Sequence, residues 1–268
     1  MYQNVRQMVQ TIQTRRSHRH FTDELLSIEH ASQVQRFIAS LEPPFKHSVR
    51  ISYHIVPNGF DIVYFKGPRQ FIALEAENSI AEQAKLGFLG ELIVLYCESL
   101  GIRTCWIGHY KKNQVHNIVY KDTERVGNRQ LYCIIVIGYT PERTDLMDRF
   151  SKKRFSKKNR DIASFLDSDS IKLLSKELQF SLNLASKAPS AMNSQKWYYR
   201  IITDGSITKV EVGKIKGYQH FKWHYYDIDV GTAAAHCWLG LLLQGFVPTI
   251  SLSSDKMDSS WLFSIRNN

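Results

Sequence analysis

The sequence lacks an uninterrupted apolar run long enough to span a membrane. Its two most apolar stretches lie near Leu86–Leu100 and Val230–Phe246, and the first of them carries Glu91 and Glu98. A membrane-spanning helix needs about 20 consecutive apolar residues, so both stretches are too short or are interrupted by charge. The N-terminal segment has basic side chains but no apolar core, which is not typical of a secretory signal. We therefore expect a soluble protein that begins with an amphipathic helix.

Cysteine is scarce, and it does not occur in metal-binding spacing. The chain has 4 cysteines and no C-x-x-C pair, and each cysteine lies inside an apolar segment. This placement is typical of small buried hydrophobic side chains rather than of ligands or disulfide partners. A reducing compartment such as the cytoplasm fits this usage.

Several motifs of enzyme chemistry are also missing. No G-x-G-x-x-G follows a strand, and the P-loop, H-E-x-x-H and G-x-S-x-G patterns do not occur. His18 and His20 have the spacing of a metal-binding pair, but nothing near them supplies further ligands. We therefore predict no metal site and no catalytic side-chain nucleophile.

Positive charge is in excess, and much of it is local. The net charge is +10, and residues 149–160, with the sequence RFSKKRFSKKNR, hold basic residues and no acidic one. Such an excess attracts anionic partners, among them nucleic acid, an acidic membrane or a phosphorylated cofactor. A run of like charges is equally common in solvated loops, so composition alone leaves both interpretations open.

The chain contains an internal repeat. Gly87 and Gly101 bracket one apolar helical segment, and Gly231 and Gly245 bracket another, with an offset of 144 at both ends. The glycines of two predicted hairpin turns differ by 146 positions, and the prolines that end two amphipathic helices differ by 145. Anchors that recur in one order at nearly one offset indicate a duplicated unit.

Each half predicts the same order of elements. A helix is followed by a hairpin, a long buried helix that ends at glycine, and a strand. The first hairpin is predicted within RISYHIVPNGFDIVYF and the second within YYRIITDGSITKVEV. This order gives an α+β fold of two tandem half-repeats, with the long helices packed on one another as in a dimer. We expect a first half at 1–148, a basic connecting arm at 149–160 and a second half at 161–268.

Four segments together resemble the flavin-dependent nitroreductase family. They are RRSHRHF at 15–21, LGIRTCWIG at 100–108, VIGYTPE at 136–142 and APSAMNSQKW at 188–197. The last is similar to the family signature A-P-S-x-x-N-x-Q-P-W, with Lys196 in place of the proline. The resemblance extends across nearly the whole chain, and it implies a nitroreductase-like fold.

The resemblance also implies a cofactor and the residues that hold it. Family members bind FMN at a homodimer interface and pass hydride from NAD(P)H through the flavin to a small acceptor such as a nitroaromatic or a quinone. Arginines suit a phosphate because the guanidinium binds it through two hydrogen bonds. Glycine beside the ring lets a backbone donor approach without a Cβ in the way. By correspondence with the family motifs, the cofactor-binding residues would be Arg15, Arg16, Ser17 and Arg19, then Ile107 and Gly108, then Lys152 and Arg154, and finally Pro189, Ser190, Ala191 and Asn193.

The two halves complement each other. In ordinary members the A-P-S loop follows the Arg-Arg-Ser element closely, at a place where this chain has LEPPFKHSV. The second half keeps APSAMN but has no Arg-Arg-Ser. We therefore expect a fused pseudo-dimer with a single composite site, so that a cytoplasmic monomer would suffice, with no membrane or nucleic-acid partner. Two alternatives stay open: a flavin-binding protein without efficient turnover, and a nucleic-acid module suggested by the basic run.

Overall fold

The computed structural model describes residues 4–65, 67–121, 128–141, 161–215, 224–254 and 258–266. The predicted basic arm at 149–160 lies outside these residues, and so do Lys152 and Arg154. The proposed boundaries between the two halves therefore stay a prediction.

Two four-stranded antiparallel sheets have the same strand order. The first consists of β1 (Arg50–Ile55), β2 (Gln70–Glu77), β3 (Arg103–Ile107) and β4 (Arg129–Gly138), in the order β1-β2-β4-β3. The second consists of β5 (Trp197–Asp204), β6 (Ile207–Lys214), β7 (Thr249–Ser254) and β8 (Ser259–Arg266), in the order β5-β6-β8-β7. Counted within each half, the strands follow one pattern. This is the α+β repeat that the sequence predicts, with a further strand between the long helix and the last strand of each half, β3 and β7.

One predicted hairpin is correct and the other is wrong in its second strand. The strands β5 and β6 pair as expected, with Asp204 opposite Ile207 and the turn at Gly205 and Ser206. In the first half the turn at Gly59 does form, with φ +82°, but β1 pairs with residues 70–75 instead of 60–65. Ile62 and Val63 pack into a small hydrophobic cluster instead of joining the sheet. That cluster covers one face of the first sheet, together with residues of α4 (Lys112–Val119).

The predicted helices are present, with one interruption. The long helices are α3 (Ile80–Ser99) and α8 (Tyr226–Leu243), and α2 (Ile28–Ala39) precedes the first sheet. The helix expected before the A-P-S loop is divided into α6 (Ser168–Lys172) and α7 (Lys176–Ala185), because Ser175 caps a new helix through Leu178 N. Short 3-10 turns occupy Ile162–Phe165 and Ala191–Asn193, and α1 (Val5–Thr14) begins the described chain.

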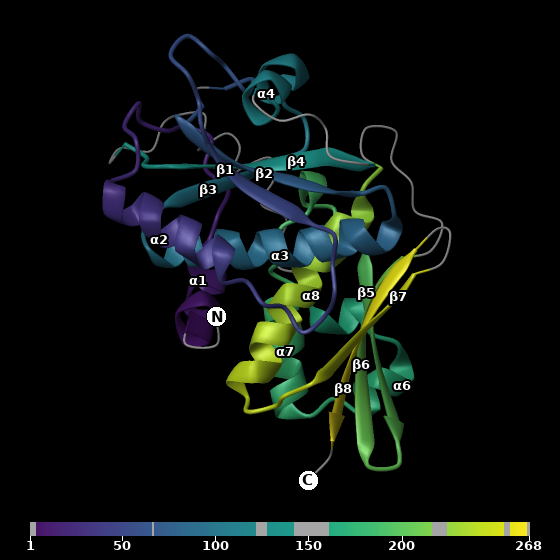
Figure 1. The fold of residues 1–268 in the computed structure, drawn as a ribbon. Helices are drawn as coiled ribbons and strands as arrows, with labels where there is room; N and C mark the ends of the chain where they lie inside the picture. Colours follow the sequence, from purple (N-terminus) through teal and green to yellow (C-terminus); the bar gives the residue numbers. More distant parts are fainter. Residues whose placement is uncertain are drawn as a thin grey trace.

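The helices α3 and α8 cross each other (Figure 1). Two glycines lie at their contact. A Cβ atom on Gly87 would collide with the backbone of Ile228, and one on Gly231 would collide with the backbone of Ala84. The offset of 144 that separates the two glycines also separates Ala84 from Ile228. The contact of Gly87 with Ile228 and the contact of Gly231 with Ala84 are therefore equivalent in the two halves. The crossing thus lies on the pseudo-twofold axis that relates the halves.

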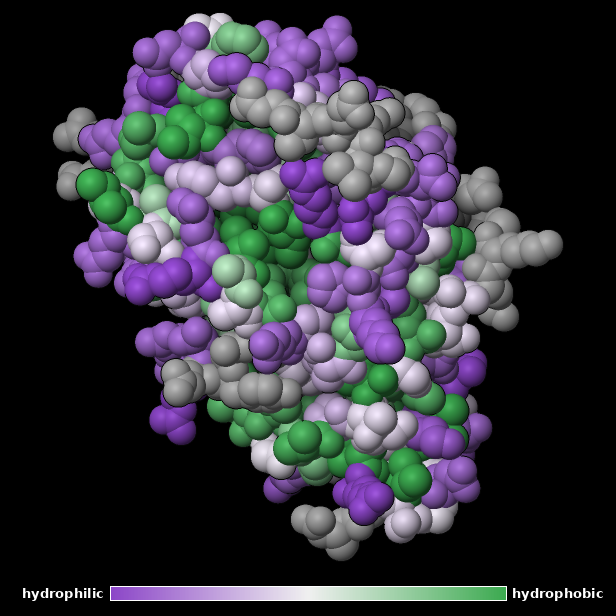
Figure 2. Space-filling model, viewed as in Figure 1, coloured by the Kyte–Doolittle hydropathy of each residue, from purple (hydrophilic) through white to green (hydrophobic). Residues whose placement is uncertain are grey.

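The two halves share one hydrophobic core. The Phe88 ring of α3 lies 5.5 Å from the Trp238 ring of α8 and 5.0 Å from the Trp261 ring of β8. A single cluster of buried side chains includes these residues and runs through both halves. Figure 2 shows hydrophilic residues over most of one face, and hydrophobic residues gathered near its middle. Within the described ranges, no helix is long and apolar enough to cross a membrane.

Candidate functional site

The first predicted segment begins where α1 ends. Arg15 is the C-cap of α1, and the chain then runs beside β3, where His18 N donates a hydrogen bond to Thr104 O at 3.0 Å. The arginines differ in their surroundings, although the sequence suggested one exposed basic helix end. Arg16 is exposed, whereas the side chain of Arg15 is only 9% exposed. Ser17 and Arg19 are half-buried.

The second predicted segment is a strained loop after α7. Met192, Asn193 and Gln195 have φ values of 53°, 52° and 48°. Elsewhere in the described chain, positive φ angles occur only at glycine. A left-handed backbone at a residue with a side chain costs on the order of 1–3 kcal/mol, and such residues cluster at functional sites. The surrounding contacts must therefore hold this loop in place.

Those contacts come mainly from α8. Asp229 accepts hydrogen bonds from Ala191 N at 3.1 Å through both carboxylate oxygens, and Thr232 Oγ1 donates to Pro189 O at 2.8 Å. Within the loop, Ser190 Oγ accepts from Gln195 N at 2.9 Å. Because α8 crosses α3 beside these residues, the loop is fixed relative to the first half as well as the second. Sequence reasoning missed Asp229, although an acidic residue in an apolar helix is a signal for such a role.

The loop also contains a buried hydroxyl group without a partner. Ser194 is 8% exposed, and its Oγ atom has no hydrogen-bond partner among the described residues. Buried polar atoms in folded proteins nearly always have one. Several other buried polar atoms of the described residues also lack a partner, and Ser194 Oγ is the one that lies in this loop.

The third predicted segment ends the edge strand β3. The side chain of Ile107 is buried, whereas Gly108 is exposed. Gly108 lines an open pocket of about 440 Å³ together with Tyr64 and His109, whose rings stack at a centroid distance of 5.4 Å. The backbone at Gly108 is therefore accessible to a ligand from outside.

A buried carboxylate links the predicted segments. Glu91, in the middle of α3, has a fully buried side chain. Its Oε1 atom lies 3.8 Å from Arg15 Nε and 2.9 Å from Nε2 of His236 in α8, and its Oε2 atom accepts a hydrogen bond from Trp106 Nε1 at 2.8 Å. On the other side of the ring, His236 Nδ1 lies 3.0 Å from Leu184 O in α7.

This network brings together parts of the chain that are far apart in sequence. It joins the Arg15 segment, the residue before Ile107, and the helix that leads into the A-P-S loop. A second link is made by Lys187, whose Nζ atom contacts Gln13 Oε1. Neither Glu91 nor His236 is among the residues that the sequence motifs predict. The signal in the sequence was Glu91 itself, a charged residue in the middle of a long helix that is mostly apolar.

The corresponding loop of the first half is held differently. Ser48 donates to Glu82 Oε2 through its backbone N at 2.6 Å and through its hydroxyl at 2.8 Å, and Lys85 pairs with the same carboxylate. The left-handed residues that characterise the loop after α7 do not occur in this loop. The loop of the first half has therefore lost the conformation of its counterpart as well as its sequence.

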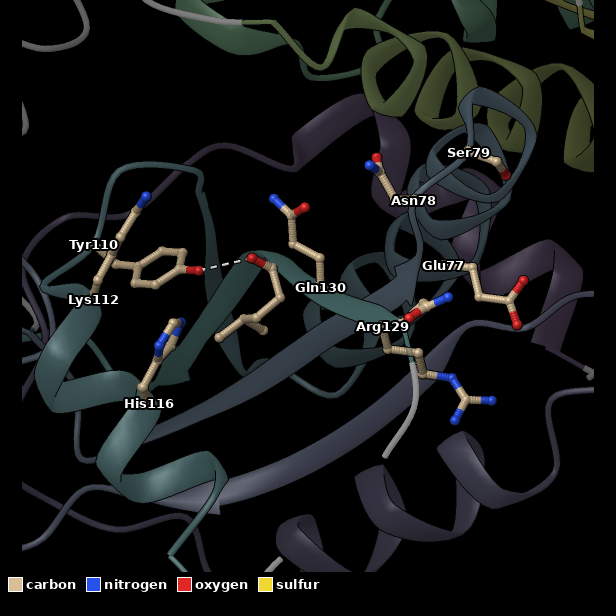
Figure 3. Close-up of a pocket in the computed structure, with 10 residues that line it drawn as sticks. Glu77, Asn78, Ser79, Tyr110, Lys112, His116, Arg129 and Gln130 are labelled. Atoms are coloured by element: carbon tan, nitrogen blue, oxygen red, sulfur yellow. Dashed lines mark hydrogen bonds between the residues drawn. The ribbon is translucent and has the colours of Figure 1, made fainter. Parts of the chain in front are cut away.

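Figure 3 shows a larger pocket, of about 840 Å³, within the first half. Lys112 and His116 of α4 lie on one side of it and Glu77 and Arg129 on the other. Tyr110 borders it and donates to Leu131 O at 3.0 Å. The lining residues come from the first half alone and include none of the predicted flavin contacts. This pocket is therefore separate from the composite site that the motifs predict. The described residues also contain no cluster of side chains that could hold a metal ion.

Comparisons with known proteins agree with this architecture. The family model described as "Putative TM nitroreductase" matches residues 7–241. A crystal structure from Thermotoga maritima, described as a putative nitroreductase, is similar over 97% of this chain and 94% of its own, with a TM-score of 0.64 and 22% identity. None of the curated proteins matches the sequence.

Two further structures each cover about half of this chain. A nitroreductase with bound FMN from Bacteroides fragilis covers 52% of this chain and 91% of its own, with a TM-score of 0.42 and 14% identity. A nitroreductase family protein from Clostridium difficile covers 55% and 91%, with a TM-score of 0.41 and 14% identity. The Thermotoga maritima structure, in contrast, has the same fold over both halves. The family model matches most of the length of the present chain. The chain therefore belongs to the nitroreductase family, which consists of oxidoreductases.

Proposed function

We propose that the protein is an FMN-dependent oxidoreductase that passes hydride from NAD(P)H, through the flavin, to a small oxidised acceptor such as a nitroaromatic or a quinone. The chemistry of the family supports the class of reaction. The observation that carries the proposal is the Glu91 network, because it connects the Arg15 segment of one half with the helix that leads into the A-P-S loop of the other.

The described residues fit a flavin in three respects. Arg16 is exposed and forms no ion pair within the described part of the chain, so its charge is available to a phosphate. The strained loop presents Ser194 Oγ without a partner, and Gly108 leaves its backbone open. FMN has a part to match each of these groups. Its phosphate would pair with the arginine, its ring would form a hydrogen bond with the hydroxyl, and the edge of the ring would accept from the backbone donor.

The proposed contacts follow the family motifs. The phosphate and the ribityl chain would be bound by the Arg15 segment and by the basic run outside the described residues. The A-P-S loop would line the ring, and the end of β3 would approach its edge. The residues are Arg15, Arg16, Ser17 and Arg19 with Lys152 and Arg154; Pro189, Ser190, Ala191 and Asn193; and Ile107 with Gly108.

FMN, when bound, would supply the hydride chemistry. The protein would bind, orient and shield. Arg15 and Arg16 would neutralise the phosphate, and Asp229 and Thr232 would hold the ring-lining loop in its strained conformation. Gly108 would allow the backbone to approach the ring because it has no Cβ atom. No side-chain nucleophile is required.

We propose one FMN per chain and a monomer sufficient for binding. Only one half has an Arg-Arg-Ser element, and among the described residues only the other has a loop in which residues other than glycine are left-handed. The fusion would thus supply within one chain the interface that a homodimer forms from two.

The absorbance spectrum of the purified protein, followed by titration of FMN into apoprotein of known concentration, tests this proposal. We expect flavin absorbance, or quenching of FMN fluorescence, that saturates at one equivalent. Anaerobic NADH and NADPH, added separately, should bleach the flavin, and a benzoquinone or a nitroaromatic acid should restore its colour.

The possible outcomes separate the alternatives. A protein that neither contains nor binds FMN would rule out the proposal. FMN binding without bleaching by either nucleotide would favour a flavin-binding protein without turnover. Saturation at two equivalents per chain would contradict the single composite site.

A further inference from the structure

The Glu91–His236 pair occurs on only one side of the pseudo-twofold axis. At the repeat offset of 144, the counterpart of Glu91 is Ala235 and the counterpart of His236 is Leu92. All four residues are fully buried where α3 and α8 pack together. The fold therefore accommodates an apolar pair at one of the two equivalent places and contains a polar pair at the other.

Burial makes the polar pair costly unless its hydrogen bonds are complete. Desolvating two ionisable groups costs several kcal/mol per ion, and an apolar pair of similar volume is often as stable or more so. Since the twin position shows that an apolar pair fits this packing, stability alone does not explain Glu91 and His236. A role of the pair at the adjacent proposed flavin site would explain why it is polar.

The hydrogen bonds of the pair involve groups from four elements or segments. Leu184 O can only accept a hydrogen bond, so Nδ1 of His236 carries a proton. The contact of 2.9 Å between Nε2 and Glu91 Oε1 then needs one further proton, held by the ring or by the carboxyl group. Trp106 Nε1 donates to the other oxygen, and Arg15 stands beside the first. Each oxygen of the Glu91 carboxyl group therefore has a donor or a cation beside it.

We infer that Glu91 and His236 are positioning residues for the proposed flavin site. The inference rests on the proposed function. Glu91 holds the guanidinium of Arg15 at the end of α1 and fixes the indole of Trp106 directly before Ile107 and Gly108. His236 ties that carboxylate to the C-terminal turn of α7, from which the A-P-S loop departs. One buried pair thus sets the relative position of the phosphate-binding and ring-binding parts of the site.

The fold itself supplies a test variant. Glu91→Ala combined with His236→Leu places the residues of the apolar twin at the polar position. The apoprotein of this double variant should fold, but it should unfold at a lower temperature than the wild type, because Trp106 Nε1 and Leu184 O lose their hydrogen-bond partners. Its dissociation constant for FMN should rise at least tenfold, because Arg15 and the two ring-binding segments lose their common anchor.

A cycle with Arg15→Ala shows whether the pair acts through that arginine. In the Arg15→Ala background, the double change should raise the dissociation constant much less than in the wild type. Leu92→Ala is the matched control, since it removes buried volume from the next position of α3 without touching the network. It should lower the unfolding temperature and leave FMN affinity within about twofold.

The two hypotheses fail in different ways. Wild-type protein that binds no FMN would refute the proposed function. Wild-type protein that binds FMN, together with a folded Glu91→Ala/His236→Leu variant that binds it equally well, would refute the positioning role alone. If the double variant does not fold, Glu91→Gln serves in its place. Unchanged affinity in that folded variant, with its charge removed, would also refute the role.

Discussion

Replacing either glycine at the crossing of α3 and α8 by alanine should destabilise the protein. A Cβ atom on Gly87 would lie 2.8 Å from the carbonyl carbon of Ile228 and 2.9 Å from its Cα atom. A Cβ atom on Gly231 would lie 2.8 Å from Phe88 N. Carbon atoms pack best at about 3.5–4.0 Å. Because the obstacles are backbone atoms, no change of rotamer relieves the clash, and the helices must move apart.

Two opposing terms set the magnitude. Alanine favours a helix over glycine by about 1 kcal/mol. Overpacking a well-filled core costs typically about 1–3 kcal/mol, and a collision with backbone belongs at the upper end of that range. We expect each variant to lose about 2 kcal/mol of the free energy of unfolding, out of roughly 5–15 kcal/mol for a native protein.

Urea denaturation, followed by circular dichroism and by tryptophan fluorescence, measures this loss. Asn183→Ala, at an exposed position of α7, is the control and should change stability by no more than about 0.5 kcal/mol. The Gly87→Ala/Gly231→Ala variant should lose less than the sum of the single losses, since one separation of the helices relieves both clashes. If both single variants match or exceed the wild type, helix propensity outweighs the contact and the close crossing is wrong.

The remaining predictions concern charge and exposure. Arg16→Ala should weaken FMN binding roughly ten- to hundredfold, from a loss of about 1.5–3 kcal/mol, and leave the unfolding temperature unchanged. Arg15→Ala should weaken FMN binding and also lower the unfolding temperature, because it removes a cation beside buried Glu91. Equal unfolding temperatures for the two variants would contradict the difference in burial between the two arginines. The four cysteines should not react with a thiol dye at pH 8 until denaturant is added, since all are buried and burial raises the pKa of the Cys97, Cys133 and Cys237 thiols. Rapid labelling of the native protein would show that the thiols are accessible. Burial lowers the pKa of His54 below its ordinary value of 6.5, so below that pH the unfolded chain binds a proton that the folded chain does not, and stability falls as pH drops through 6.5. His54→Gln should reduce this fall in the free energy of unfolding between pH 7.5 and 5.5, measured by urea titration. An unchanged dependence of that free energy on pH would argue against the burial effect.

Local patterns in the sequence predict the repeated architecture well. The glycines at constant offset identify the long helices, and Gly87 and Gly231 prove to be the residues at their crossing. The Asp204-Gly205 pair predicts β5 and β6, because a two-residue turn places the second strand directly beside the first. Burial of the cysteines follows from their apolar neighbours in the chain. In each case, neighbouring residues carry the information.

Features that depend on distant partners were decided by tertiary structure. The turn at Gly59 forms, yet β1 pairs with residues 70–75, while Ile62 and Val63 are buried in the hydrophobic cluster against the sheet. The motifs indicate Arg15 but not its burial, which depends on how α1 packs against the long helices. Glu91 and His236 are 145 residues apart and have no common motif. Only the angle and depth at which α3 crosses α8 bring them together, since a hydrogen bond depends on position in space, whereas sequence patterns record position along the chain.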